Sequence, residues 1–373
     1  MNHYLKEVKA KADVIFLSEV NWSYLRQRHH FFAESYAKKN HNVIYVGKIG
    51  LRYPKIKDIL KIFRKKQINS LINSSHKGVY FFKGLLLPPI NFFFNVLNDL
   101  WFANKLVRST KSNQIIVHFY QPTKLVYDLV IKLKDSGKQV TLIYDCVQDY
   151  RFHPSRSKSL LNFEKILTNQ SDIVIADSIV NLKRLDFNKK ILVPPGVDVN
   201  HFRIKTQNKL NSNQTKKILY YGNIRQDLDF NMINKIGVSK KFEIILLGLL
   251  NVSNSKFNKR VKILDAIDYK ELPKIIKNYD ALILPYDVSN SFTEAIIPAK
   301  FFECLATGLP IISTKMISTK KFHHLLNIIN NDTNFDDFKL KNITFKEKIE
   351  REKIINSSSW SNRFKSFYEK IKY

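Results

Sequence analysis

The stretch Pro298-Ala-Lys-Phe-Phe-Glu-Cys-Leu-Ala-Thr-Gly-Leu-Pro-Ile-Ile-Ser313 carries the strongest structural signal in this chain of 373 residues. Pro298 suits the start of a helix and Gly308 suits its end, because proline presets the helical backbone angle and glycine readily adopts the left-handed conformation of a C-cap. The β-branched residues that follow predict a buried strand. Lys300 and Glu303 lie one turn apart, so they share one face of the predicted helix.

That face has two interpretations. A helix N-terminus presents free N–H groups and the positive end of the helix dipole, which suits a diphosphate. Lys300 would add a point charge there, and Glu303 would accept hydrogen bonds from ribose hydroxyls. The alternative is an ordinary capped helix with a Lys–Glu pair at its surface.

Short β-branched runs alternate with longer amphipathic stretches along the rest of the chain. The predicted strands are 13–17, 42–46, 115–119, 140–144, 172–176, 217–221, 242–247, 261–264, 281–284 and 310–313. Helical patterns cover 24–39, 269–278 and 345–372. Strands separated by helices predict parallel, doubly wound sheets covered on both faces, with ligands at the carboxyl ends of the strands.

Composition narrows the class of protein. Lysine and arginine number 62 against 32 aspartates and glutamates, a net charge of +30, while apolar residues make up 44%. This apolar content excludes wholesale disorder, and the charge indicates a polyanionic partner such as nucleic acid, an anionic membrane or a phosphorylated substrate. Two cysteines, Cys146 and Cys304, exclude a disulfide framework and a zinc cluster and favour a reducing compartment.

Two segments bear on the membrane. The most apolar stretch, Leu85 to Phe102, is interrupted by prolines, asparagines and Asp99, so it falls short of the ~18 apolar residues of a spanning helix. Residues 1–20 carry too many charges for a signal peptide. Segment 55–66 has an apolar stripe ringed by lysines and an arginine, which predicts contact with an anionic membrane surface; the alternative is an ordinary half-buried helix. We expect a cytoplasmic protein, peripheral on the inner face of the cell membrane.

Segment 298–313 resembles the nucleotide-binding segment of GT-B-fold glycosyltransferases, with the pattern Pro-x-Lys-x-x-Glu-x-x-Ala-x-Gly-x-Pro. Further segments resemble, in chain order, motifs of bacterial family 4-type transferases of teichuronic acid, capsule or exopolysaccharide. These are Trp22 with Gln27-Arg28-His29-His30, Tyr144 to Asp149, Glu164 with Ser171 to Ser178, Pro194 to Asp198 with Phe202, Tyr221 to Ile224, and Tyr279 to Tyr286.

The resemblance implies two Rossmann-like, doubly wound domains that face each other across a cleft, with the C-terminal helix returning to the N-terminal domain. It implies an acceptor-binding domain over 1–205, a linker over 206–216, a nucleotide-sugar-binding domain over 217–350 and a C-terminal helix over 351–373. The implied reaction moves a sugar from a nucleotide sugar, with UDP as the default, to a lipid-linked or polysaccharide acceptor of the cell envelope. It needs no cofactor and no metal.

Carried over residue by residue, the resemblance predicts the site. The predicted donor-binding residues are Gly222, Asn223, Arg225, Tyr286, Glu294, Lys300 and Glu303. The predicted acceptor-binding residues are Trp22, Gln27 and Arg28. Asp149, at the end of a predicted strand, is the candidate base for the acceptor hydroxyl; its alternative is a loop or N-cap acid.

The sequence also departs from the family pattern. Gln148 stands where an aspartate is usual, Pro195 replaces an asparagine, and Glu294 lies nine residues before Glu303 instead of eight. Two alternatives therefore stay open: a sugar-nucleotide epimerase of the same fold, and an inactive transferase paralogue acting as a membrane-associated binding protein. Dispersed basic residues without a zinc-finger, RRM-type or KH-type motif predict no specific nucleic-acid partner.

Overall fold

The computed structural model describes residues 11–22, 26–47, 72–73, 78–82, 96–152, 157–204, 215–289, 293 and 297–371. The chain forms two compact units. Unit 1 comprises Met1–Asp177, Asn181–Val193 and Phe364–Tyr373, and unit 2 comprises Ser178–Val180 and Pro194–Arg363. Each unit is built on its own sheet, as the alternation of strands and helices in the sequence predicts.

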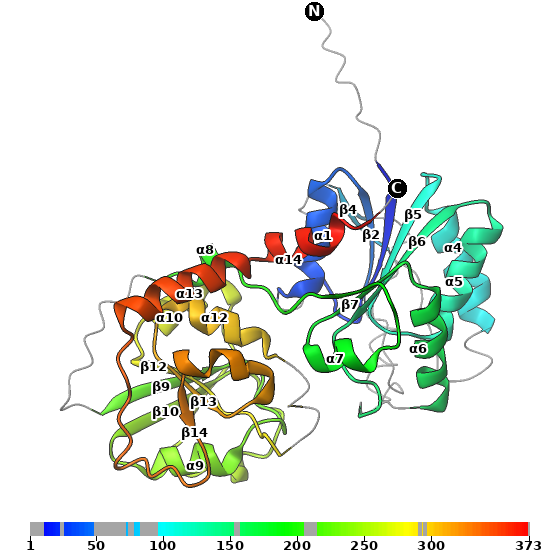
Figure 1. Cartoon of the computed structure of the whole chain (residues 1–373). Coiled ribbons are helices and arrows are strands. Elements are labelled where there is room, and N and C mark those ends of the chain that lie inside the picture. The colour runs from blue at the N-terminus through cyan, green and yellow to red at the C-terminus, as the bar shows by residue number, and fades with distance from the viewer. Residues whose placement is uncertain are drawn as a thin grey trace, which may run out of the picture. The chain divides into compact units, whose positions relative to one another are not determined.

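Unit 1 contains a sheet in the order β3-β4-β2-β1-β5-β6-β7-β8, parallel except for β3 (Figure 1). Its strands are β1 (Asp13–Leu17), β2 (Asn42–Val46), β3 (Ile72–Asn73), β4 (Val79–Phe81), β5 (Gln114–Phe119), β6 (Gln139–Cys146), β7 (Ile173–Ala176) and β8 (Lys190–Leu192). Every residue of β1 is buried, as expected of a strand covered on both faces.

Helices cover both faces of this sheet. They are α1 (Arg28–Lys38), the π-helical turn η1 (Asn98–Ala103), α4 (Asn104–Arg108), α5 (Lys124–Asp135) and α6 (Lys158–Gln170). The short helix α7 (Ile179–Arg184) follows β7, and its first two residues belong to unit 2. Figure 1 shows α1 on one face and α4, α5 and α6 on the other. The predicted helix over 24–39 is wrong at its start. Gln27 is extended and its N–H donates to His30 Nδ1 at 3.2 Å, so the helix begins only at Arg28.

Unit 2 contains a parallel sheet in the order β11-β10-β9-β12-β13-β14. Its strands are β9 (Lys216–Tyr221), β10 (Phe242–Leu247), β11 (Lys262–Leu264), β12 (Ala281–Leu284), β13 (Ile311–Thr314) and β14 (Asn327–Ile329). Figure 1 shows α9 (Phe230–Val238) on one face and α12 (Ala299–Thr307) on the other. From β9 the strand order runs through β10 to β11 in one direction and through β12 and β13 to β14 in the other, so right-handed connections place the two helices on opposite faces. Short elements complete the unit: α8 (Val199–Phe202), η2 (Asn254–Lys256), η3 (Tyr269–Glu271), α10 (Leu272–Ile276) and η4 (Ile317–Leu325).

The ten predicted strands are all present, within one or two residues at their ends. The sequence analysis missed β3, β4, β8 and β14, each of which has only two or three residues. The helix predicted over 269–278 is instead the tight turn η3 followed by α10, because the Asp268 side chain accepts the Lys270 N–H and caps a 3₁₀ turn.

The C-terminal pattern 345–372 forms two helices, α13 (Phe345–Ser357) and α14 (Trp360–Tyr368), where a single helix was predicted. The interruption has a long-range cause: the Val197 N–H donates to Ser358 O, and Val197 O accepts the Trp360 N–H. The end of α14 belongs to unit 1, as the GT-B resemblance implies. There Phe367 packs on Phe32 of α1 with 5.3 Å between ring centroids.

Two predicted features lie outside the described residues: segment 55–66 and most of the linker 206–216. No helix in the described part of the chain is long and apolar enough to cross a bilayer.

Candidate functional site

Two glycines at the carboxyl ends of neighbouring strands bring backbone segments of unit 2 into close contact. Gly222 follows β9 with φ +118° and Gly248 follows β10 with φ +153°, both in the region that favours glycine. A Cβ on Gly248 would lie 2.0 Å from Gly222 O, and a Cβ on Gly222 would lie 2.2 Å from Lys300 Cε. Lys300 therefore lies directly against bare backbone. The sequence analysis missed Gly248, although it follows a predicted strand just as Gly222 does.

Helix α12 forms as its sequence predicts. Pro298 is the N-cap, and Gly308 ends the helix with φ +74°. Its Lys300 and Glu303 point toward the end of β9, where Lys300 Nζ lies 5.3 Å from the Tyr220 ring centroid. The Tyr221 hydroxyl donates to Glu303 Oε2 at 3.1 Å. A cation and a carboxylate thus stand side by side at the carboxyl edge of the sheet.

The pKa values of these two groups are shifted. Burial raises the pKa of Glu303 to about 7, and the neighbouring Lys300 ammonium and the Tyr221 hydrogen bond only partly oppose it. Burial works against the charged Lys300, but the oxygens of Tyr220, Tyr286 and Glu303 outweigh it and raise its pKa. Lys300 is therefore a cation at neutral pH, while Glu303 titrates near neutrality.

The other predicted donor residues gather around the same pair. Tyr286 is buried just after β12, and its hydroxyl and Lys300 each shift the pKa of the other. Asn223 O accepts a hydrogen bond from the Tyr220 hydroxyl at 2.9 Å. Arg225 is exposed and donates to Asp227 at 2.7 Å. The structure so brings together six of the seven predicted donor residues; the seventh, Glu294, lies outside the described residues.

In unit 1 the predicted acceptor residue Arg28 lies in a buried ion pair. Its Nε and Nη2 donate to the Asp145 carboxylate at 2.8 and 2.9 Å, and its Nη1 donates to Val193 O at 2.7 Å. His118 Nε2 lies 3.2 Å from the same carboxylate. Burial would raise the pKa of Asp145, but Arg28 and His118 lower it to about 2. Arg28 thus has a role inside the unit that the sequence did not reveal.

The other two predicted acceptor residues lie close by. Gln27 is the N-cap of α1. Trp22 packs against His30, Tyr45 and Phe81, with ring centroids 5.0 to 5.1 Å apart. Their role in acceptor binding stays a prediction.

Asp149, the predicted base, is held by arginines. Its carboxylate accepts from Arg151 Nε and Nη2 at 3.0 and 2.6 Å, Arg184 Nε lies 3.7 Å away, and only 1% of its surface is exposed. Burial opposes ionisation, but the hydrogen bonds from Arg151 and the charge of Arg184 lower its pKa. The carboxylate is therefore ionised at neutral pH but is a weak base.

The sequence analysis did not identify a second carboxylate near the end of a strand, that of Glu19. It follows β1 by two residues, is half-buried, and accepts from Gln121 Nε2 at 2.7 Å. Burial raises its pKa, and hydrogen bonds from Gln121 and Gln148 only partly oppose this. No described arginine or lysine forms an ion pair with it. Its position directly after a predicted strand was the available signal.

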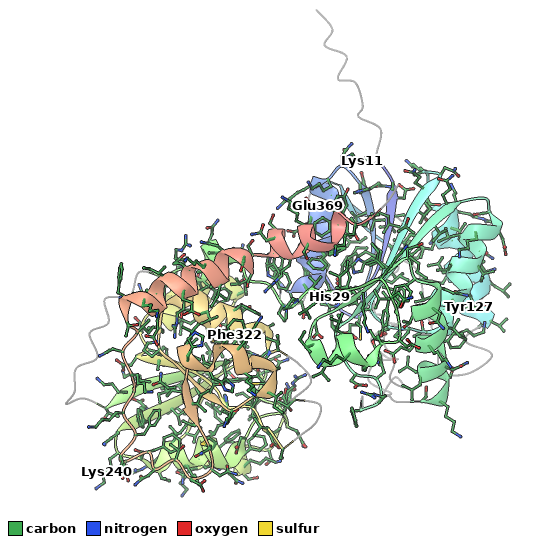
Figure 2. The ribbon with its side chains drawn as sticks, in the orientation of Figure 1. Lys11, His29, Tyr127, Lys240, Phe322 and Glu369 are labelled. Atoms are coloured by element: carbon green, nitrogen blue, oxygen red, sulfur yellow. The ribbon has the colours of Figure 1, made fainter. Side chains whose placement is uncertain are left out.

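Tyr120 directly precedes Gln121, the hydrogen-bond partner of Glu19, and its ring packs against that of His29. Figure 2 labels His29, which lies in the first turn of α1. Its ring stacks on Tyr120 with centroids 3.8 Å apart. Within the described part of the chain, the two ring nitrogens and the Tyr120 hydroxyl have no hydrogen-bond partner. Burial lowers the pKa of His29 to about 3, so its imidazole is neutral.

Comparisons with known proteins agree with the fold that the sequence motifs indicate. No protein-family model matches the chain. A Bacillus subtilis (strain 168) protein named "Putative teichuronic acid biosynthesis glycosyltransferase TuaH" is 31% identical over 109 residues, so the match spans about a quarter of each protein, 27% of this chain and 27% of that one. Sucrose-phosphate synthase from Thermosynechococcus elongatus has a TM-score of 0.59 at 11% identity, over 94% of this chain and 91% of that one.

The Anabaena protein Alr3699/HepE, solved in complex with UDP and glucose, has a TM-score of 0.54 at 11% identity, over 96% of this chain and 95% of that one. These structural matches extend over nearly the whole of each chain, in both units. Together with the sequence motifs and the local match to TuaH, they show that this chain has the GT-B fold of glycosyltransferases.

Proposed function

We propose that this protein transfers a sugar from a nucleoside-diphosphate sugar, with UDP as the expected nucleotide, to a lipid-linked or polysaccharide acceptor of the cell envelope. The observation that carries the proposal is the Lys300–Glu303 pair on α12, set against the bare backbone of Gly222. The UDP and glucose bound to the Anabaena protein and the teichuronic acid name of the Bacillus relative support the donor and the acceptor, respectively.

Each donor-side group has a task that fits its chemistry. Transfer leaves negative charge on the departing diphosphate, which Lys300 and the N-terminus of α12 would stabilise, with Arg225 as a second cation. Glu303 would accept hydrogen bonds from the ribose hydroxyls. Because Gly222 carries no side chain, the diphosphate would approach the backbone of Gly222 and Asn223 closely, and Tyr286 would line the sugar pocket. Because these groups supply the positive charge, we expect no cofactor; Glu294 stays a predicted donor residue.

The acceptor would bind to unit 1, where Trp22, Gln27 and Arg28 are the predicted contacts. A lipid-linked acceptor places the enzyme at the inner face of the membrane, with segment 55–66 as a predicted contact with anionic lipid. No specific nucleic-acid partner is expected.

The donor proposal predicts selective binding of one nucleotide. Calorimetry of the full chain against UDP, GDP, ADP and CMP at pH 8 should show UDP as the tightest ligand. Glu303→Ala should weaken UDP binding roughly 10- to 150-fold, because a hydrogen bond to a charged group contributes about 1.5–3 kcal/mol. A folded protein that binds none of the four nucleotides is instead an inactive paralogue.

The pH dependence of UDP binding provides the control. Since only the ionised Glu303 accepts both ribose hydrogen bonds, UDP affinity should fall about tenfold between pH 8 and pH 6, given a pKa of about 7. Glu303→Gln carries no titrating group at this position and should retain only the change that comes from UDP itself. Equal pH profiles for both proteins would remove Glu303 from the ribose site.

The base is tested by comparing two carboxylates. Asp149→Asn is expected to leave UDP binding intact and to abolish sugar transfer from a UDP-sugar to a lipid extract of bacterial membranes, measured as UDP release. Glu19→Gln is the matched comparison, because the pKa of Glu19 is raised while that of Asp149 is lowered, and the Glu19 side chain is half-buried while that of Asp149 is buried. Loss of a general base costs typically 10²–10⁴-fold in rate. Transfer that survives Asp149→Asn but is lost in Glu19→Gln would assign the base to Glu19.

A further inference from the structure

Unit 1 exposes three apolar side chains along one helical segment that runs from residue 96 to residue 108. Val96 is 37% exposed, Leu100 51% and Trp101 65%. The opposite face of the segment is already packed: Phe102 and Leu106 are buried, and the Phe102 ring lies 5.1 Å from that of Phe82. The exposed residues are therefore not part of the core of unit 1.

The local backbone places these side chains at the surface. Residues 98–103 form the π-helical turn η1, and the segment continues directly as α4. The Asn104 side chain donates to Leu100 O at 2.8 Å, which holds the wide turn at its end. Wide turns of this kind are uncommon in helices and frequently occur at functional positions. Here the turn brings two consecutive large apolar residues, Leu100 and Trp101, to the outside.

Basic residues continue the same face. Lys105 and Arg108 follow Trp101 by four and seven residues, which places them one and two turns further along, and both are exposed. Lys111 follows them in the sequence, and Asp99 is the only acidic residue of the stretch 96–111. The stretch is also the described end of the most apolar run of the sequence.

This combination matches the chemistry of an anionic bilayer surface. Tryptophan favours the boundary between hydrocarbon and water, because its ring is apolar and its N–H is polar. Each lysine or arginine near such a surface strengthens binding by about 1 kcal/mol, or roughly fivefold. Lys105 Nζ lies 6.0 Å from the Phe82 ring centroid. The apolar stems of Lys105 and Arg108 are long enough to lie along lipid while their charges reach the phosphates.

We propose that the face formed by Val96, Leu100, Trp101, Lys105 and Arg108, the η1–α4 face, docks on the surface of a bilayer that contains anionic lipid. The three apolar side chains are enough to enter the headgroup region and too few to cross the membrane. The face consists of other residues than the predicted contact at 55–66, and docking needs no bound nucleotide. It would hold unit 1 where a lipid-linked acceptor is presented.

The test is flotation of the full chain with vesicles of phosphatidylcholine alone or with 30% phosphatidylglycerol, at 50 and 300 mM salt. Wild-type protein should float with the anionic vesicles and be released by salt. Leu100→Ser with Trp101→Ser should reduce binding at least tenfold. Phe345→Ser is the matched control, since Phe345 is 79% exposed on unit 2 and should leave binding unchanged. Lys105→Glu with Arg108→Glu should lose more than Lys240→Glu with Lys241→Glu, a charge control whose Lys240 is labelled in Figure 2.

A second measurement needs no variant. Brominated acyl chains quench only tryptophans that enter the bilayer, so anionic vesicles of brominated lipid should quench the Trp101 emission. Trp360 is buried in unit 2, and Trp22 is half-buried and packs against His30, so both should contribute little. Absent quenching, or unchanged flotation of the Leu100/Trp101 variant, would overturn the proposal. If light scattering gives twice the monomer mass for the wild type but not for this variant, the face binds a second copy of the chain and not a membrane.

Discussion

Replacing Gly222 with alanine is expected to remove most of the UDP affinity while leaving every charged group of the donor site in the chain. The added Cβ would lie 2.2 Å from Lys300 Cε and 2.7 Å from its Nζ, so the ammonium must leave its place. Lys300→Met removes the same charge directly and should weaken UDP binding roughly 10- to 150-fold, as expected for a charge-assisted contact of about 1.5–3 kcal/mol. Gly222→Ala should match or exceed that loss.

Gly137→Ala is the control for backbone strain. Gly137 also has a positive φ, +74°, but a Cβ there meets nothing within 4 Å. Both alanine variants should lose about 1 kcal/mol of stability from the left-handed backbone, measured by chemical denaturation. Only Gly222→Ala should lose UDP affinity in calorimetry. If its affinity equals that of wild type, Lys300 does not contact the diphosphate.

The sequence predicts the parts of this fold that depend on local pattern. Apolar β-branched runs identify ten of the described strands, and Pro298 with Gly308 delimits α12, because both signals act within a few residues. The interruption after α13 could not be predicted in this way. It depends on hydrogen bonds between Val197 and Ser358, which are 161 positions apart by their residue numbers.

The residues of the candidate site likewise divide into those that a local pattern predicts and those that depend on the folded chain. Lys300 and Glu303 were predictable because helical spacing alone puts them on one face. Glu19 and Gly248 were within reach, since each follows a predicted strand where parallel sheets bind ligands. The partner of Arg28 could not be predicted, because Asp145 lies 117 residues further along the chain and only the folded sheet brings the two together.

Arg28 therefore carries the last prediction, on stability. Arg28→Met should cost about 3–5 kcal/mol in the free energy of unfolding at pH 7, because it leaves the Asp145 carboxylate buried without its cation. Arg26→Met is the matched control. Arg26 pairs with Glu34 and is one-third exposed, so its loss should cost less than about 1 kcal/mol. Urea denaturation of both variants gives the comparison.

The pH dependence of these stabilities separates an ion pair from simple loss of packing. In the wild type the pKa of Asp145 is lowered from 3.8 to about 2, so its contribution, about 2 kcal/mol, is present above pH 4 and is lost as the pH falls toward 2. In Arg28→Met, burial without the cation should raise that pKa, and acidification from pH 7 to pH 5 should then stabilise the variant relative to wild type. If Arg28→Met is as stable as Arg26→Met and loses only sugar transfer, the guanidinium serves the acceptor and not the fold.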